Sequence, residues 1–268
     1  MKNDLIKILF FGDIVGRNAR NKVISVVYEM REEFGCDFVV ANCENAAGGF
    51  GVTPSICNEL LDSGIDVLTS GNHIWDKPEI SSYIAKENCL LRPLNMIREY
   101  PGNGSVIVKN SDGFRLGVVN ILTNLFMQKS DNLFISIDKL LEKLELSKDA
   151  DAIIIDIHGE ATSEKMAFGH YVDGRVSAVL GTHTHVPTSD CRILSLGTAF
   201  QTDVGMCGDY NSVIGMDKKL SIQKFLGKKN KKFMVAKGEA TICATLVEIN
   251  IRTGLAKSIC SVKKFGCL

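Results

Sequence analysis

The feature that most constrains the fold is an alternation of short apolar runs with segments of helical periodicity. In the N-terminal third, the apolar runs are 6–13, 37–44 and 66–73, and the segments with helical spacing are 20–35, 53–64 and 77–88. Short apolar runs bounded by turn residues are typical of buried strands. Strands that alternate with helices are typical of α/β proteins. The sequence therefore predicts the α/β class.

The rest of the chain extends this pattern and adds antiparallel elements. We expect a hairpin over 104–122 with its turn near 111–113, and a C-terminal strand pair around 252–254. Between them, further strands are predicted at 150–159 and 176–185, and further helices at 133–146 and 161–172. No repeat or linker interrupts residues 1–268. We therefore predict a single domain with a mixed sheet, or two mixed sheets packed face to face, with helices outside.

Composition excludes several classes of function. The 31 basic and 31 acidic residues cancel, so nothing predicts stable DNA binding or attraction to an anionic membrane. The basic run 226–233 has little aromatic interleaving and predicts a solvated loop. No apolar stretch reaches the roughly 20 residues of a membrane span. The N-terminus resembles a first strand rather than a signal peptide, so we expect a cytoplasmic protein whose nine scattered cysteines are reduced.

The chemistry-bearing side chains gather where the predicted strands end. These residues are Asp13, then Glu44 and Asn45, then Asn72 and His73, then His158, and finally His183 and His185. Ligands of open α/β sheets bind outside the carboxyl ends of the strands. Five such ends with carboxylate, amide and imidazole groups can therefore form one site.

Each of these groups also has an ordinary structural explanation. Asp13 can be a turn residue or a helix cap, and Glu44 with Asn45 can belong to a glycine-rich turn. His158 alone can be a core histidine. His183 and His185 would face the same side if they lie in a strand, which favours a shared site. Four of the five histidines lie at these strand ends, whereas His170 lies in a predicted helix and is interpreted as structural.

Imidazole, carboxylate and amide ligands suit divalent metals such as Fe, Mn, Zn or Co. The set contains too much nitrogen for a dedicated Ca or Mg site. One carboxylate can bridge two ions, and the remaining groups are numerous enough for two coordination spheres. Two ions about 3.5–4 Å apart are the arrangement that stabilises phosphoryl displacement.

Taken together, these motifs resemble those of the calcineurin-like metallophosphoesterases. The matching segments are GDIVG (12–16), NCENAAGG (42–49), GNHIWD (71–76), IHGEATSEK (157–165) and GTHTH (181–185). The first motif lacks its usual histidine, since position 15 is Val, and Glu44 stands where an aspartate is usual. Glu44 followed by Asn45, together with the segment GTAFQTDVGMCG (197–208), makes the sequence similar to the YmdB-like branch of that superfamily.

The resemblance implies a role for each residue of the set. Asp13 and His185 correspond to ligands of a first metal, Glu44 to a carboxylate that bridges both metals, and Asn45 to a replacement for the missing histidine. Ligands of the second metal correspond to Asn72, His158 and His183. His73 corresponds to the general acid, because an imidazole can protonate a leaving oxygen near neutral pH. Thr182 and Thr184 either face away or support the ligands from behind.

The resemblance also implies a dinuclear phosphodiesterase that hydrolyses small phosphoesters, such as 2′,3′-cyclic nucleotides, by attack of a metal-activated hydroxide. Iron is the expected metal, with manganese as the alternative and zinc possible, and a homo-oligomer is expected. Two alternatives stay open: a phosphomonoesterase or phosphoprotein phosphatase, and a metal-containing regulatory protein that acts through a partner. Three residues also have open roles. Arg175 pairs with Asp173 or contacts phosphate, and Trp75 and Phe50 stack on a base or belong to the core or an interface.

Overall fold

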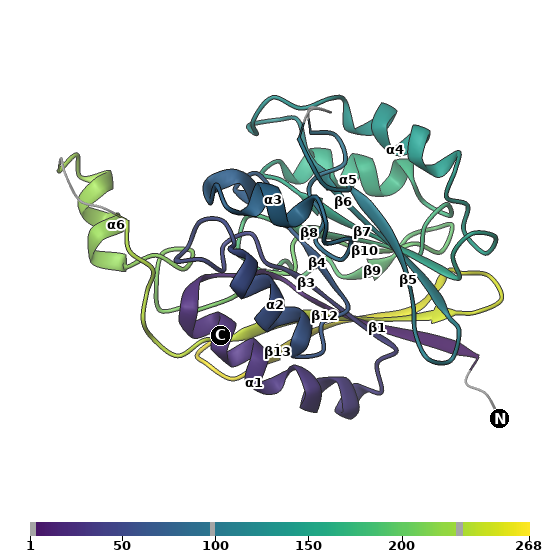
Figure 1. Ribbon diagram of the computed structural model, residues 1–268, viewed down its shortest axis with the longest axis horizontal. Helices are drawn as coiled ribbons and strands as arrows, with labels where there is room; N and C mark the ends of the chain where they lie inside the picture. The colour runs from purple at the N-terminus through teal and green to yellow at the C-terminus, as the bar shows by residue number, and fades with distance from the viewer. Residues whose placement is uncertain (1–3, 97–99, 229–232) are drawn as a thin grey trace.

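Two β-sheets packed face to face form the centre of the protein, and helices cover both outer faces (Figure 1). The structure is a computed structural model that describes residues 4–96, 100–228 and 233–268. The arrangement confirms the predicted α/β class with two mixed sheets and flanking helices.

The first sheet has the strand order β13-β12-β1-β3-β4. Its strands are β1 (Leu5–Phe11), β3 (Phe38–Asn42), β4 (Val67–Thr69), β12 (Ile242–Asn250) and β13 (Ala256–Lys264). The strands β1, β3 and β4 are parallel, whereas β12 and β13 are antiparallel to their neighbours. The C-terminal strand pair, predicted around 252–254, therefore completes a sheet begun at the N-terminus.

The second sheet has the strand order β5-β6-β7-β8-β10-β9. Its strands are β5 (Ser105–Lys109), β6 (Arg115–Leu122), β7 (Ala152–His158), β8 (Ala178–Thr182), β9 (Arg192–Ile193) and β10 (Ala199–Gln201). The four central strands are parallel, and the predicted hairpin adds β5 antiparallel at one edge. A separate two-stranded ribbon pairs β2 (Asp13–Ile14) with β11 (Met206–Cys207).

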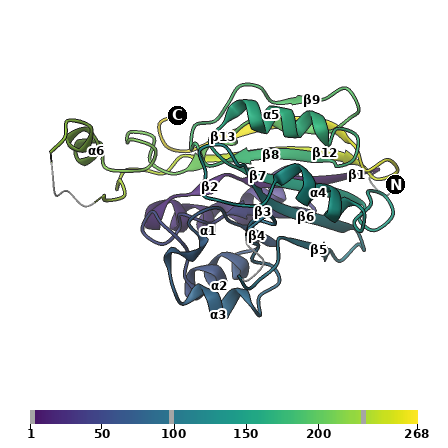
Figure 2. The ribbon, with the colours of Figure 1, turned by 90° about the horizontal axis from the view of Figure 1, so that it is seen from above.

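The helices lie mainly in two outer layers. They are α1 (Gly16–Phe34), α2 (Pro54–Asp62), α3 (Ile80–Ile84), α4 (Leu133–Leu141), α5 (Thr162–Tyr171) and α6 (Lys218–Phe225), with a short 3-10 turn η1 (Ile74–Asp76). The first three cover the first sheet, and α4 and α5 cover the second. Both views show α6 standing apart from these layers (Figure 2). No helix of the described residues is long and apolar enough to span a bilayer.

Alternation along β1 shows how one sequence pattern builds two cores. Ile6, Ile8 and Phe10 point into the core between the sheets, whereas Leu9 and Phe11 point outward against the helices. Successive side chains of a strand face opposite sides, so a continuous apolar run can serve both layers. The arrangement therefore buries most of β1 on both faces.

Several predicted boundaries are wrong. The strand expected over 176–185 ends at Thr182, and α1 begins at Gly16 rather than at residue 20. The helices predicted over 77–88 and 133–146 are shorter, because each ends in turns. The short strands and α6 between residues 186 and 240 were not predicted, because their apolar runs are too brief for a periodicity signal. Of the predicted loop 226–233, residues 229–232 lie outside the described residues.

Candidate metal centre

The predicted strand ends of the two sheets meet at one edge of the sandwich. Oε1 of Glu44, which follows β3, lies 3.0 Å from Nε2 of His158 at the end of β7. The backbone N–H of His183, after β8, donates to Oδ2 of Asp13 at 3.1 Å. These contacts join residues more than 100 positions apart in the chain, so the topology itself assembles the site.

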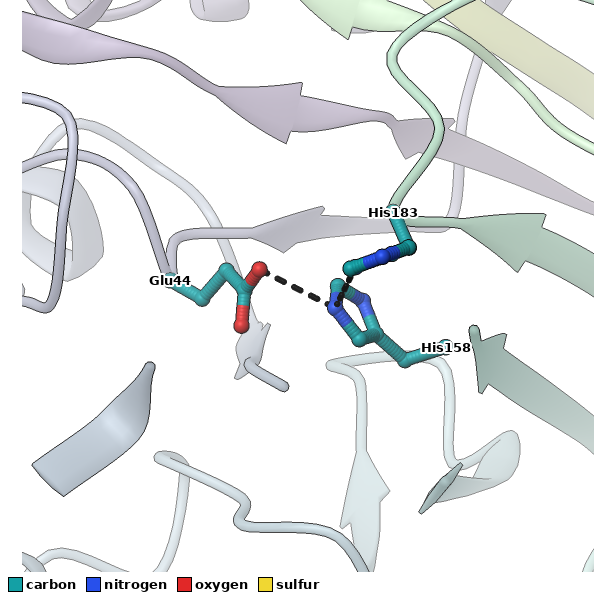
Figure 3. Close-up of side chains that lie close together, drawn as sticks. All are labelled: Glu44, His158 and His183. Carbon is teal, nitrogen blue, oxygen red and sulfur yellow. Dashed lines mark hydrogen bonds and ion pairs between the residues drawn. The ribbon is translucent and has the colours of Figure 1, made fainter. Parts of the chain in front are cut away.

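Nε2 of His158 is the centre of a compact group of ligand atoms (Figure 3). Besides Glu44, the group contains Oδ1 of Asn72 at 3.2 Å and Nδ1 of His183 at 3.1 Å. The ligand atoms of Glu44, His158 and His183 all lie within 4.8 Å of one another. One ring nitrogen cannot satisfy three such atoms with a single hydrogen. The chemistry of this group therefore fits a metal cation better than a hydrogen-bond network.

The other face of the His158 ring is held by a buried polar network. Oγ1 of Thr182 lies 2.8 Å from Nδ1 of His158 and donates to Oδ1 of Asp156 at 2.6 Å. Because the Thr182 hydroxyl donates its hydrogen to Asp156, Thr182 accepts from Nδ1–H, so Nε2 is the ring nitrogen that faces the cluster. Partners of this kind orient the histidine ligands of metals. Thr182 thus supports the cluster from behind, which is one of the two roles predicted for it.

A second, looser group contains Asp13, Asn45 and His185. Nε2 of His185 lies 3.8 Å from Oδ1 of Asp13 and 3.2 Å from Nδ2 of Asn45. The Asp13 Oδ1 atom is buried and has no hydrogen-bond partner among the described residues. Nδ1 of His185 faces the carbonyl of Ile214 at 2.9 Å, which leaves Nε2 for the site. Asn45 can act as a ligand only through Oδ1, so its amide would have to turn over.

The two histidines of the H-x-H motif reach the site by a route that the sequence did not predict. Both lie beyond β8 with left-handed backbones, φ 97° for His183 and 66° for His185. The strand alternation that was expected to align them is therefore absent. The turn nevertheless places His183 in the His158 group and His185 beside Asp13.

A buried ion pair holds this turn. Nζ of Lys165 donates to the carbonyl of Thr182 at 2.6 Å and lies 3.1 Å from Oδ2 of Asp203. The same carboxylate oxygen accepts from the backbone N–H of Thr184 at 3.0 Å. Both ionic side chains are fully buried. Neither was singled out from the sequence, although Lys165 lies within the segment IHGEATSEK.

His73 lies at the rim of the same site. Its Nδ1 is 2.8 Å from Oδ2 of Asp76, its ring meets Phe50 edge to face at 5.0 Å, and its backbone N–H donates to Oε2 of Glu44. Asp76 was not singled out from the sequence, although its position three residues after His73 was the available signal. The geometry is that of a carboxylate that orients an imidazole.

Four groups of the cluster have pKa values far from their ordinary values. Burial raises the pKa of Asp13 to about 6. For Glu44, burial is outweighed by the charge and hydrogen bond of His158, which lower the pKa to about 2. The same pairing overcomes burial of His158 and raises its pKa to about 9. Burial, and then the charge of His158, lower the pKa of His183 to about 3, so this imidazole is neutral and its lone pair is available.

A cavity of about 420 Å³ opens beside these residues. Its lining includes Glu44, Asn45, His73, His183 and His185, together with apolar residues from a segment farther along the chain. The volume suits a small organic ligand.

Three residues whose roles were left open are also placed. Phe50 lines the cavity, whereas Trp75 stacks on Tyr100 and packs against the core. The predicted ion pair of Arg175 with Asp173 is wrong. Arg175 pairs with Asp138 at 2.8 Å, because Asp173 instead accepts backbone N–H groups of the 196–198 turn.

Comparisons with known proteins agree with this architecture. The sequence model of the YmdB-like protein family matches residues 9–262. A 2′,3′-cyclic-nucleotide 2′-phosphodiesterase of Bacillus subtilis is 42% identical over 254 residues, which cover 95% of each chain. The crystal structure of a hypothetical protein from Thermus thermophilus is similar, with a TM-score of 0.89 and 38% sequence identity; the match covers 97% of this chain and 99% of the other. The crystal structure of a novel phosphatase of Mycoplasma pneumoniae matches with a TM-score of 0.88 and 32% sequence identity, over 97% of this chain and 93% of the other.

Proposed function

The chain belongs to the YmdB-like protein family, and we propose that it is a metal-dependent phosphodiesterase that opens 2′,3′-cyclic nucleotides. The observation that carries the proposal is the convergence of Glu44, Asn72 and His183 on Nε2 of His158, next to a cavity that His73 also lines. The name of the Bacillus subtilis relative supports the substrate class.

We propose that this site would hold two ions and that Glu44 would be a ligand of both. The first would be held by Asp13, Asn45 and His185, and the second by Asn72, His158 and His183. The buried Oδ1 atom of Asp13, which has no hydrogen-bond partner among the described residues, fits this assignment, because a cation would complete its interactions. Iron is the proposed metal, with manganese as the alternative and zinc possible, since imidazole and carboxylate ligands suit all three. When bound, the ions would polarise the phosphoryl group and lower the pKa of a water molecule that serves as nucleophile.

The side chains of this protein would supply the proton that the leaving oxygen needs. Water oxygen adds to phosphorus as the bond from phosphorus to the ribose 2′ oxygen breaks, which yields a 3′-phosphate. Nε2–H of His73 would protonate the leaving oxygen, while Asp76 fixes the ring through Nδ1. The choice of the 2′ bond follows the activity for which the Bacillus subtilis relative is named.

The experiment that tests the proposal combines metal analysis with a substrate panel. Protein loaded anaerobically with Fe²⁺ or Mn²⁺ is assayed on 2′,3′-cyclic nucleotides, a linear phosphodiester, a phosphomonoester and a phosphopeptide. We expect the cyclic nucleotides to give the highest kcat/KM. A preference for the phosphomonoester or phosphopeptide would favour the phosphatase alternative, and a loaded protein inert on the whole panel would favour a regulatory protein.

Two substitutions separate the proposed roles. His73→Ala should lower kcat and leave the metal content unchanged, since His73 is not proposed as a ligand. Glu44→Gln should lower the content of both ions together, because its carboxylate is proposed to serve both. A Glu44→Gln variant with two ions and the full rate would contradict the bridging role.

The remaining expectations stay predictions. We propose that residues 1–268 form a single domain, which is supported by the pairing of β12 with β1 from opposite ends of the chain. We also propose that the protein forms a homo-oligomer, which light scattering would test. We propose further that it does not bind DNA stably, which titration with duplex DNA would test.

A further inference from the structure

The cavity beside the metal centre has two chemically different walls. The strand ends supply the polar wall described above. The apolar wall belongs to the described parts of residues 212–236, here called the arm, which include α6 and project from the sandwich (Figures 1 and 2). The arm contributes five apolar residues to the cavity, namely Val213, Ile214, Met216, Phe225 and Phe233.

The arm is attached to the metal site rather than simply near it. The carbonyl of Ile214 lies 2.9 Å from Nδ1 of His185, and Ile214 also lines the cavity. Two backbone hydrogen bonds of 2.8 Å join the outgoing and returning segments of the arm. Asp217 N–H donates to the Met234 carbonyl, and Ala236 N–H donates to the Gly215 carbonyl. The apolar wall is therefore held in a defined place relative to the proposed ligands.

Two aromatic rings of the arm are exposed at this wall. Phe225 is 85% exposed and Phe233 is 37% exposed, although both line the cavity. Nζ of Lys224 lies 3.8 Å from the centre of the Phe233 ring, which restrains that ring. Exposed aromatic side chains at the mouth of a site are suited to a ligand with a flat apolar face.

We propose that the arm forms a nucleobase subsite, in which Phe225 and Phe233 contact the base of a nucleotide whose phosphate lies at the metal centre. The inference rests on the proposed function, because it assumes that a phosphoester occupies the polar wall. The cavity combines a charged end with an apolar end, as the nucleotide does, and its volume of about 420 Å³ suits such a ligand.

The composition of the apolar wall also predicts that the site distinguishes the four bases only weakly. Ser221 is the polar residue that the arm contributes to the cavity within the described part of the chain, and its hydroxyl already donates to the Asp217 carbonyl at 2.9 Å. Contact with aromatic rings accepts every base, because each base has a π-face. Discrimination among the four bases should stay far below the roughly 10⁴-fold that hydrogen-bonding sites achieve.

The test compares two substrates that differ only in the base. Adenosine 2′,3′-cyclic phosphate carries a base, and methyl riboside 2′,3′-cyclic phosphate has a methoxy group in its place. For Phe225→Ala, Phe233→Ala and the double variant, we measure the ratio of kcat/KM for the nucleotide to kcat/KM for the riboside. The double variant should lower this ratio roughly 5- to 150-fold, the effect of removing an aromatic side chain that stacks on a base.

Two control variants remove exposed apolar side chains that do not line the cavity. Leu226→Ala changes the neighbour of Phe225 on the arm, and Phe126→Ala removes an exposed aromatic ring from another loop. Both should keep the wild-type ratio. Calorimetric binding of AMP, compared with ribose 5-phosphate, gives a second readout that does not depend on turnover.

The possible results separate the subsite from the function itself. A double variant that keeps the wild-type ratio and the wild-type affinity for AMP overturns the subsite while the phosphodiesterase stands. An equal loss on both substrates, together with a smaller particle by light scattering, also overturns it and assigns the arm to contacts between copies of the chain. A loaded wild-type protein inactive on both substrates overturns the proposed function, and with it the subsite.

Discussion

Gly71 offers the sharpest test of the proposed metal centre, because a single added methyl group would enter the ligand cluster. The residue follows β4 and is buried directly beneath the proposed ligands. A Cβ atom at this position would lie 2.2 Å from Oε2 of Glu44 and 2.3 Å from Nε2 of His158. The backbone of Gly71 does not have the positive φ that disfavours other residues, so alanine should act through this clash alone.

The size of the displacement determines the expected effect. Ordinary van der Waals contact begins near 3.4 Å, so both ligand atoms must retreat by about 1 Å in Gly71→Ala. Metal–ligand distances tolerate only about 0.2 Å. Disturbing even an outer partner of a ligand weakens metal binding roughly 10- to 100-fold, and displacing two ligands should weaken it at least as much.

The assay is a calorimetric titration of metal-free protein with Mn²⁺, followed by metal analysis after dialysis. The matched control is Gly117→Ala in β6, where the new Cβ would meet Ile153 at 3.3 Å and no proposed ligand. This control should bind Mn²⁺ like the wild type. If Gly71→Ala stays folded and binds Mn²⁺ with unchanged affinity and stoichiometry, Glu44 and His158 do not hold the metal as proposed.

Two further substitutions test the residues that position the site. Asp76→Asn should lower kcat about tenfold without changing metal content, since it weakens the contact that orients His73; the effect is modest because both side chains are partly exposed. An unchanged rate would remove Asp76 from the mechanism. Lys165→Met should lower the free energy of unfolding by about 3–5 kcal/mol, because it leaves Asp203 buried without its ion-pair partner. Urea denaturation measures this loss, and a change below about 1 kcal/mol would contradict the structural role of the pair.

The sequence was sufficient to predict the gathering of the polar groups, for a physical reason. Asp13, Glu44, Asn72 and His158 each follow an apolar run closely, and the carboxyl ends of neighbouring parallel strands meet at one edge. Local pattern and sheet topology together therefore bring these residues close. No comparable local rule specifies which atoms come into contact. The sequence therefore does not predict the contact of Thr182 with His158 or that of Asp76 with His73.

The H-x-H motif reaches the cluster by a route that strand alternation did not predict. We expected His183 and His185 to share one face of a strand, but β8 ends before them and both have left-handed backbones. Lys165 and Asp203, which hold this turn, are 38 residues apart. A contact of that range leaves no periodic signal, so the sequence alone favoured the simpler continuation of the strand.

The sequence does not predict the role of the arm, because that role also depends on long-range placement. Phe225 and Phe233 have no apolar periodicity around them, and their importance lies only in where the chain returns to the cavity. The polar wall is built from short motifs at strand ends, whereas the apolar wall depends on long-range placement. Substitutions in the arm should therefore alter which phosphoesters are preferred while the metal ligands are retained. Substitutions in the motifs should instead remove the chemistry for every substrate, so the two classes of variant separate recognition from catalysis.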